Sequence, residues 1–347
     1  ALGALLYMPA HNKNIEDILL RQKYPSLTSV VLCLEDAISD DELESTERFL
    51  INLLKNSVQE NCHYMGYAPM IFIRVRNPDH FESIYKQLGD LSCLTGYVLP
   101  KFDSCNAEHY LHVLKEVNSH ALRPVYCMPI LESSKVMYRE SRVDELTKLH
   151  RIIANNRELV LNIRIGVTDL CGLYSIRRSP ETTIYDIGVV RDCISDIVNF
   201  FSRAASDYVI SGPVWEYFEK DRSYQLGYTS GLIREIILDK ANTLLGKTII
   251  HPNHIPVVNS LYAVTQEEFR DAQDIIGSKQ NGVLKSSYRN KMNEVKPHLN
   301  WAQRVMRRAH VYGVLNEGQT HVDLLEAIVV AENESKHRID AEIQYSR

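Results

Sequence analysis

Short apolar runs alternate with amphipathic helical patterns along most of the chain. Between the runs, apolar residues recur every three to four positions, which predicts helices with one buried stripe over segments such as 14–23, 41–56, 107–117, 189–205 and 230–245. The runs are continuously apolar, which is typical of strands buried on both faces in a parallel sheet. The eight predicted strands are 4–8, 30–35, 70–75, 96–101, 124–132, 159–167, 207–211 and 247–251.

Eight consecutive strand–helix units predict a sheet that closes into a (β/α)8 TIM barrel. The alternative, an open doubly wound sheet, normally has a glycine-rich turn after its first strand, and MPAHNKN contains no glycine. Beyond residue 252 the pattern becomes wholly helical and ends in the charged stretch 323–343. We therefore expect a barrel over residues 1–264 and a helical C-terminal extension over 265–347 that could pack on a neighbouring subunit.

Composition excludes several classes of protein. Hydrophobic residues make up 45% of the 347 residues and charged residues 24%, as in an ordinary globular protein. The net charge of -5 provides no basic field for a nucleic acid. There is no apolar stretch of the roughly 18 residues that a membrane span needs, and no signal pattern begins the chain, so we expect a cytoplasmic protein without a membrane partner. The seven cysteines form no CxxC pair and are expected to be mostly buried thiols.

Polar residues follow seven of the predicted strands. A single polar residue after a strand is usually a helix cap or part of a solvated loop. In a parallel barrel, however, the carboxyl ends of the strands meet at one rim, where active sites form. Seven polar strand ends on that rim predict a functional site. The residues are His11 and Asn12, Glu35 and Asp36, Arg74, Lys101, Glu132, Asp169 and His251.

Two carboxylates among these residues suggest a metal. Glu132 and Asp169 end neighbouring predicted strands, with no histidine or cysteine beside them in the sequence. Hard oxygen ligands with open positions suit Mg²⁺, which can polarise a carbonyl group. Arg74 has the planar fork to hold a substrate carboxylate. It could equally pair with Glu35 or Asp36, and the two roles are compatible.

The ordered motifs resemble the citrate lyase beta subunit / HpcH/HpaI aldolase superfamily, whose members are metal-dependent barrel lyases that act on 2-oxo acids and acyl thioesters. The match spans about 4–298 in LLYMPAHN, LEDAI, IRVRN, LPK, ILESS, GVTDL and GKTIIHPNHI. The segment IRRSPETTIYD is a feature of a divergent, citrate-lyase-like carbon–carbon bond lyase branch. Relatives are commonly trimers or hexamers, so the resemblance implies a homo-oligomer.

The resemblance also implies roles for individual residues. Glu132 and Asp169 would hold Mg²⁺, and Arg74 would hold the substrate carboxylate. Asp36 is similar to the acid that orients the arginine and the metal-bound waters. Lys101 is a further catalytic candidate with a structural alternative, as is His251. The peptide groups that would complete the substrate cradle are those of Gly166, Val167, Thr168 and Asp169.

Three departures from the family pattern point to unusual chemistry. Ala10-His11 stands where the first loop usually has VPG, and Ser211 stands where the seventh strand commonly has Asp. In thioester-cleaving relatives, an Asp reaches over a neighbouring subunit; Arg289 falls at that position, or Asn316 in an alternative alignment. We expect His11 to act as the replacement acid or base and Arg289 to bind an anionic part of a different substrate.

The leading hypothesis is a Mg²⁺-dependent carbon–carbon lyase of retro-aldol or retro-Claisen type. Its substrate would be a 2-oxo or hydroxy carboxylate, with coenzyme A thioesters among the options. Two alternatives remain open: a Mg²⁺-dependent thioesterase or decarboxylase, and a non-catalytic metabolite-binding or scaffold barrel. Measuring metal binding separates the last of these from the enzymes, because a scaffold need not retain an ordered ion.

Overall fold

The barrel predicted from the sequence is confirmed by the structure, a computed structural model that describes residues 2–61, 69–204, 208–218, 228–279 and 282–345. Eight parallel strands form one sheet in the order β7-β6-β5-β4-β3-β2-β1-β8. A parallel bridge between Gly212 and Lys247 joins the two ends of the sheet. The strands are β1 Ala4–Pro9, β2 Ser29–Cys33, β3 Met70–Arg74, β4 Leu94–Leu99, β5 Tyr126–Leu131, β6 Ile163–Ile165, β7 Ile210–Ser211 and β8 Lys247–Ile249.

Helices follow the strands and cover the outside of the sheet. After β2 the chain forms α2, a π-helical segment over Leu53–Val58 and the short α3, so this connection is longer than a single helix. Residue 207, the first of the predicted seventh strand, lies outside the described residues. The barrel helices are α1 Ile15–Leu20, α2 Asp40–Asn52, α3 Gln59–Asn61, α4 Pro78–Leu88, α5 Ala107–His120, α6 Ser134–Met137, α7 Arg139–Ala154, α8 Val167–Gly172, α9 Gly188–Phe201, α10 Tyr228–Ala241 and α11 His254–Tyr262.

The strands are buried on both faces, as their continuous apolar runs predict. On β3, Phe72 points into the barrel, where it packs with Leu5 and Val98. Its neighbours Ile71 and Ile73 point outward into the core between sheet and helices. This alternation gives the molecule an inner and an outer core, and it directs every second residue of a strand toward the barrel axis.

A fully buried ion network fixes α10 against β8. Lys247 on β8 lies 2.9 Å from Glu235 and 2.7 Å from Asp239, both on α10, and all three side chains are fully buried. Arg178, from the loop after α8, also pairs with Glu235. Burial raises the pKa of Asp239 to about 6, although the Lys247 charge opposes that shift. Every charge in this network has a partner of opposite sign, as buried charges require.

The C-terminal extension differs from the sequence prediction in one element. The prediction that the chain is wholly helical beyond residue 252 is wrong, because β9 (Val283–Lys285) and β10 (Met292–Glu294) form an antiparallel hairpin. The buried carboxylate of Asp271 on α12 (Gln266–Gly277) accepts hydrogen bonds from Ser286 and Asn293, so polar contacts hold the hairpin. The two strands are too short for a repeating pattern of apolar positions to be recognised in the sequence.

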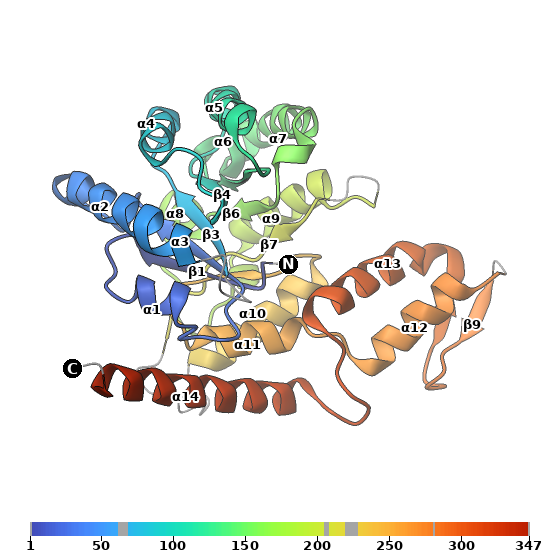
Figure 1. Cartoon of the computed structure of the whole chain (residues 1–347). Coiled ribbons are helices and arrows are strands. Elements are labelled where there is room, and N and C mark those ends of the chain that lie inside the picture. The colour runs from blue at the N-terminus through green and yellow to red at the C-terminus, as the bar shows by residue number, and fades with distance from the viewer. Residues whose placement is uncertain (1, 62–68, 205–207, 219–227, 280–281, 346–347) are drawn as a thin grey trace.

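Two long helices complete the extension. Helix α13 (Val295–Tyr312) packs on α12, and the two stand beside the barrel with the hairpin (Figure 1). Helix α14 (His321–Tyr345) runs along α11, and its Ser335 donates a hydrogen bond to the carbonyl of Gln22 at 2.9 Å. None of the helices in the described ranges is long and apolar enough to cross a membrane.

The cysteines that the structure describes are free thiols. Four of the six, including Cys127, are buried, as expected from their apolar surroundings. Cys105 is exposed instead, and Cys62 lies outside the described residues.

Candidate active site

A cavity of about 210 Å³ lies at the carboxyl ends of the barrel strands. It brings together polar groups from six strands or the loops that follow them. Both predicted metal ligands and the predicted carboxylate-binding arginine belong to its lining. The lining residues are Tyr7, Asp36, Arg74, Ile130, Glu132, Arg164, Ile165, Gly166, Val167, Thr168, Asp169, Val214, Thr248 and Ile250.

Glu132 is held rigidly at the end of β5. Its side chain is 2% exposed, and its Oε1 accepts a hydrogen bond from the backbone nitrogen of Lys101 at 2.7 Å. Burial raises the pKa of Glu132 to about 8; the charge of Asp169 adds to that shift, and Arg74 opposes it. A buried carboxyl group that resists ionisation in this way gains from a nearby cation.

The two carboxylates fit a Mg²⁺ ion. Asp169 is partly exposed and lies in the first turn of α8, directly after β6, and β6 is the neighbour of β5 in the sheet. Within the described ranges, no group of three or more His, Cys, Asp or Glu side chains could hold a metal ion. Glu132 and Asp169 would therefore supply two hard oxygen ligands and leave the other positions to water or substrate, which is the usual arrangement for Mg²⁺.

Arg74, the last residue of β3, is surrounded by carboxylates. Its Nη2 lies 2.7 Å from Glu35, 3.1 Å from Asp36 and 3.6 Å from Glu132. Burial opposes its charge, but the surrounding acidic groups prevail and hold the pKa of Arg74 above its usual value. The Nε of Arg74 is buried and has no hydrogen-bond partner in the described part of the chain. All three ion pairs use Nη2, so they leave the Nε donor of the guanidinium without an acceptor.

Lys101 ties two of these acids together. Its Nζ lies 2.9 Å from Glu35, while its backbone nitrogen binds Glu132. Its side chain is 56% exposed and its φ is 49°, an uncommon left-handed conformation for a residue other than glycine. Such conformations often occur at functional sites, because the surrounding structure must hold them. Lys101 and Glu35 do not line the cavity themselves. They contact Glu132 and Arg74, which do.

The backbone that follows β6 forms one wall of the cavity. Gly166 is the residue before α8, and all four residues of the predicted substrate cradle line the cavity: Gly166, Val167, Thr168 and Asp169. The structure thus brings together most of the residues predicted for the site.

Other sequence candidates also lie outside the lining, among them His11, His251 and Arg289. His11 is exposed in the turn after β1. His251 stacks on Phe218, with ring centroids 4.5 Å apart. Arg289 lies in the turn of the β9–β10 hairpin, at a φ of 58°. The proposed roles of His11 and Arg289 remain predictions, because a single chain does not bring either residue to the cavity.

Sequence reasoning missed three polar residues of the lining. Tyr7, Arg164 and Thr248 lie on β1, β6 and β8, within the predicted strands rather than at their ends. A charged residue inside an otherwise apolar run was the available signal for Arg164.

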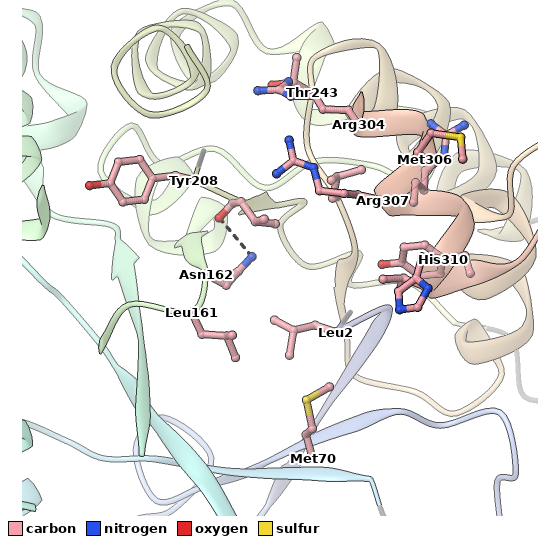
Figure 2. Close-up of a pocket in the computed structure, with 15 residues that line it drawn as sticks. Leu2, Met70, Leu161, Asn162, Tyr208, Thr243, Arg304, Met306, Arg307 and His310 are labelled. Atoms are coloured by element: carbon pink, nitrogen blue, oxygen red, sulfur yellow. Dashed lines mark hydrogen bonds between the residues drawn. The ribbon is translucent and has the colours of Figure 1, made fainter. Parts of the chain in front are cut away.

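A larger cavity, of about 510 Å³, lies at the opposite end of the barrel. Figure 2 shows Leu2, Leu161 and Met70 on its barrel side, facing Arg304 and Arg307 of α13. No carboxylate lines it, so it has no ligand set for Mg²⁺. Size therefore does not identify the candidate active site; the carboxylates do.

Residues 1–314 match the family model of C–C bond lyases of the TIM-barrel fold. The chain belongs to this family. The carbon–carbon bond lyase branch predicted from the sequence is thereby confirmed. No curated protein sequence matches the chain significantly.

Solved structures share the fold at low sequence identity. A citrate lyase of Burkholderia xenovorans is 16% identical, with a TM-score of 0.67, over 94% of this chain and 96% of its own. The protein CitE of Mycobacterium tuberculosis, in complex with magnesium, acetoacetate and coenzyme A, is 17% identical, with a TM-score of 0.56, over 89% of this chain and 98% of its own. At these low sequence identities, the comparison shows only that this chain and the two proteins share a fold.

Proposed function

We propose that this C–C bond lyase depends on Mg²⁺ and cleaves a carbon–carbon bond beside the carboxylate of a 2-oxo or hydroxy acid. The observation that carries the proposal is the convergence of Glu132, Asp169 and Arg74 on one small cavity. The structure of its fold relative CitE contains magnesium and a short oxo acid, acetoacetate, which supports a magnesium ion and a short carboxylate ligand here.

Each residue has a distinct part in the proposed reaction. Glu132 and Asp169 hold the ion, which, when bound, polarises the substrate carbonyl or hydroxyl oxygen and favours negative charge on that oxygen. Arg74 holds the substrate carboxylate through its free Nε donor, while Glu35 and Asp36 fix the guanidinium in place. The substrate is thereby oriented with its reacting carbon–carbon bond beside the ion.

The size of the cavity limits what can be enclosed. About 210 Å³ accommodates a short carboxylic acid or the acyl part of a thioester. If coenzyme A takes part, its nucleotide portion would lie outside this cavity. We further propose a homo-oligomer, in which the extension of one chain could complete the site of another.

An activity screen tests the proposed function. Purified protein is incubated with Mg²⁺ and a panel of short 2-oxo and 2-hydroxy acids and their thioesters, and the cleaved carbonyl products are detected by mass spectrometry. We expect turnover that requires Mg²⁺ and is lost in Glu132→Gln, a variant that keeps the size of the side chain and removes its charge. Ordered Mg²⁺ binding without turnover of any substrate would favour the metabolite-binding alternative.

A further inference from the structure

Arg164 is a buried cation that points into the barrel. It lies in the middle of β6, is 2% exposed, and lines the candidate active site. Its Nη1 donates to Asn162 Oδ1 at 3.4 Å and its Nη2 donates to Thr248 Oγ1. The guanidinium carbon lies 5.7 Å from the centre of the Tyr7 ring. All three partners are neutral groups.

Arg164 differs in this respect from the other buried basic side chains. Within the described ranges, each of the other buried arginine and lysine side chains pairs with at least one carboxylate: Arg74, Arg142, Arg178 and Lys247. No carboxylate pairs with Arg164 in the same ranges, and burial lowers its pKa, with only Tyr7 opposing the shift. The protein alone therefore leaves this charge without a counter-charge.

An uncompensated buried charge costs stability. Replacing such a group by an apolar residue of similar size is often neutral or stabilising. Groups that cost stability in the free protein are typical of functional sites, where a ligand later compensates them. A guanidinium has five N–H donors, and hydrogen bonds to Asn162 and Thr248 use two of them. Arg164 therefore has donors left for a ligand in the same cavity as Glu132 and Asp169.

We propose that Arg164 forms an anion-binding subsite that takes the second carboxylate of a dicarboxylate substrate. This inference rests on the proposed function, in which Arg74 holds the first carboxylate and Glu132 and Asp169 would hold the ion. It narrows the substrate class to short 2-oxo or 2-hydroxy dicarboxylic acids, since both arginines line one cavity of about 210 Å³. Thr248 Oγ1 orients the guanidinium of Arg164 by accepting a hydrogen bond from its Nη2.

The test compares two acids that differ only in the second carboxylate. Malate and lactate are titrated into the protein with Mg²⁺ by calorimetry. We expect wild-type protein to bind malate more tightly than lactate. Arg164→Met should weaken malate binding at least about tenfold, because a buried charged contact is lost, and leave lactate binding nearly unchanged. Arg164→Lys should retain part of the preference, and Thr248→Val should reduce it.

Stability provides a second measurement with a matched control. Arg142 is a buried arginine that pairs with Asp196 at 2.8 Å. In ligand-free protein, Arg164→Met should keep or raise the melting temperature, whereas Arg142→Met should lower it, because the buried carbonyl groups of Val136 and Met137 would lose their hydrogen-bond donor.

Three outcomes of these experiments test the Arg164 subsite and the proposed function. A malate-to-lactate affinity ratio that stays unchanged in Arg164→Met and Thr248→Val overturns the inference. Malate binding that needs Arg164 but not Mg²⁺ supports the subsite and contradicts the metal in the proposed function. Failure of wild-type protein to bind either acid contradicts both.

Discussion

Gly166 lies directly against the carboxyl group of Glu132. A Cβ atom on Gly166 would lie 1.9 Å from Glu132 Oε2 and 2.6 Å from Glu132 Cβ, closer than any real contact. Gly166 does not have a positive φ, so close approach rather than backbone conformation explains the glycine. The backbone after β6 therefore fixes where the carboxylate at the end of β5 can be.

Replacing Gly166 by alanine should displace the Glu132 carboxylate. We expect Gly166→Ala to lower Mg²⁺ affinity at least about tenfold, as loss of support for a metal ligand typically does. The matched control is Gly172→Ala. Gly172 is the last residue of α8, the helix that follows Gly166, and an added Cβ there meets nothing within 4 Å. Calorimetry should show wild-type Mg²⁺ affinity in the control. A Gly166→Ala protein that binds Mg²⁺ as wild type does would show that Glu132 can move without consequence.

Both proposed metal ligands should be necessary. Glu132→Ala or Asp169→Ala removes one of only two protein charges that offset the ion, so Mg²⁺ affinity should fall at least about tenfold in each variant. Glu108→Ala, on the outer helix α5, serves as a carboxylate control without an expected effect. Unchanged Mg²⁺ affinity in both site variants would remove the metal from the proposal.

Mg²⁺ should stabilise the protein more at higher pH. Because the pKa of Glu132 is raised to about 8 in the folded protein, the folded state binds the proton more tightly than the unfolded state does. Without metal, this group's contribution to stability is present at low pH and declines as pH rises from about 5 to about 8. The ion competes with that proton, so its effect on melting temperature should grow over the same window. Glu132→Gln should abolish this pH dependence; a pH-independent Mg²⁺ effect in wild type would contradict the assignment.

Arg74→Lys should weaken the binding of 2-oxo acids. Lysine keeps the charge near Glu35 and Asp36 but lacks the planar fork and the free Nε donor. We expect a loss of roughly tenfold in pyruvate affinity by calorimetry, on the order of one charged hydrogen bond. Arg76→Lys is the control, since Arg76 pairs with Asp40 and does not line the cavity. Equal pyruvate affinity in wild type and Arg74→Lys would assign Arg74 a purely structural role.

The barrel and much of its site could be predicted because their signals are local and ordered. Continuous apolar runs indicate strands buried on both faces, and a polar residue at the end of such a strand must lie on the rim. Glu132, Asp169 and Arg74 were found in this way, and the structure places all three in one lining.

The features that were missed depend on tertiary contacts. The β9–β10 hairpin is held by Asp271 rather than by an apolar stripe, so periodicity could not reveal it. The left-handed backbone of Lys101 follows from its contacts with Glu35 and Glu132. The lack of an acidic partner for Arg164 appears only when the neighbouring strands are in place.

His11 and Arg289 both lie away from the cavity within one chain. Thioester cleavage needs proton transfer by a positioned acid or base, which typically contributes roughly 10²–10⁴-fold. The sequence alignment places Arg289 where thioester-cleaving relatives have an Asp. An arginine stays charged at neutral pH, so it cannot act as the acid or base. We therefore expect little turnover of citryl-, malyl- and methylmalyl-coenzyme A by wild-type protein with Mg²⁺. Arg289→Asp should raise that turnover if the hairpin reaches a neighbouring subunit's cavity.

His11→Ala supplies the complementary measurement, because an imidazole can donate or accept a proton. On any substrate that wild-type protein does cleave, His11→Ala should lower kcat and alter its pH profile while leaving Mg²⁺ affinity intact. His109→Ala, on the outer helix α5, is the histidine control. Rapid wild-type turnover of the thioesters that neither His11→Ala nor Arg289→Asp changes would show that the catalytic acid lies elsewhere, and the exposed position of His11 would then be its ordinary place in a solvated loop.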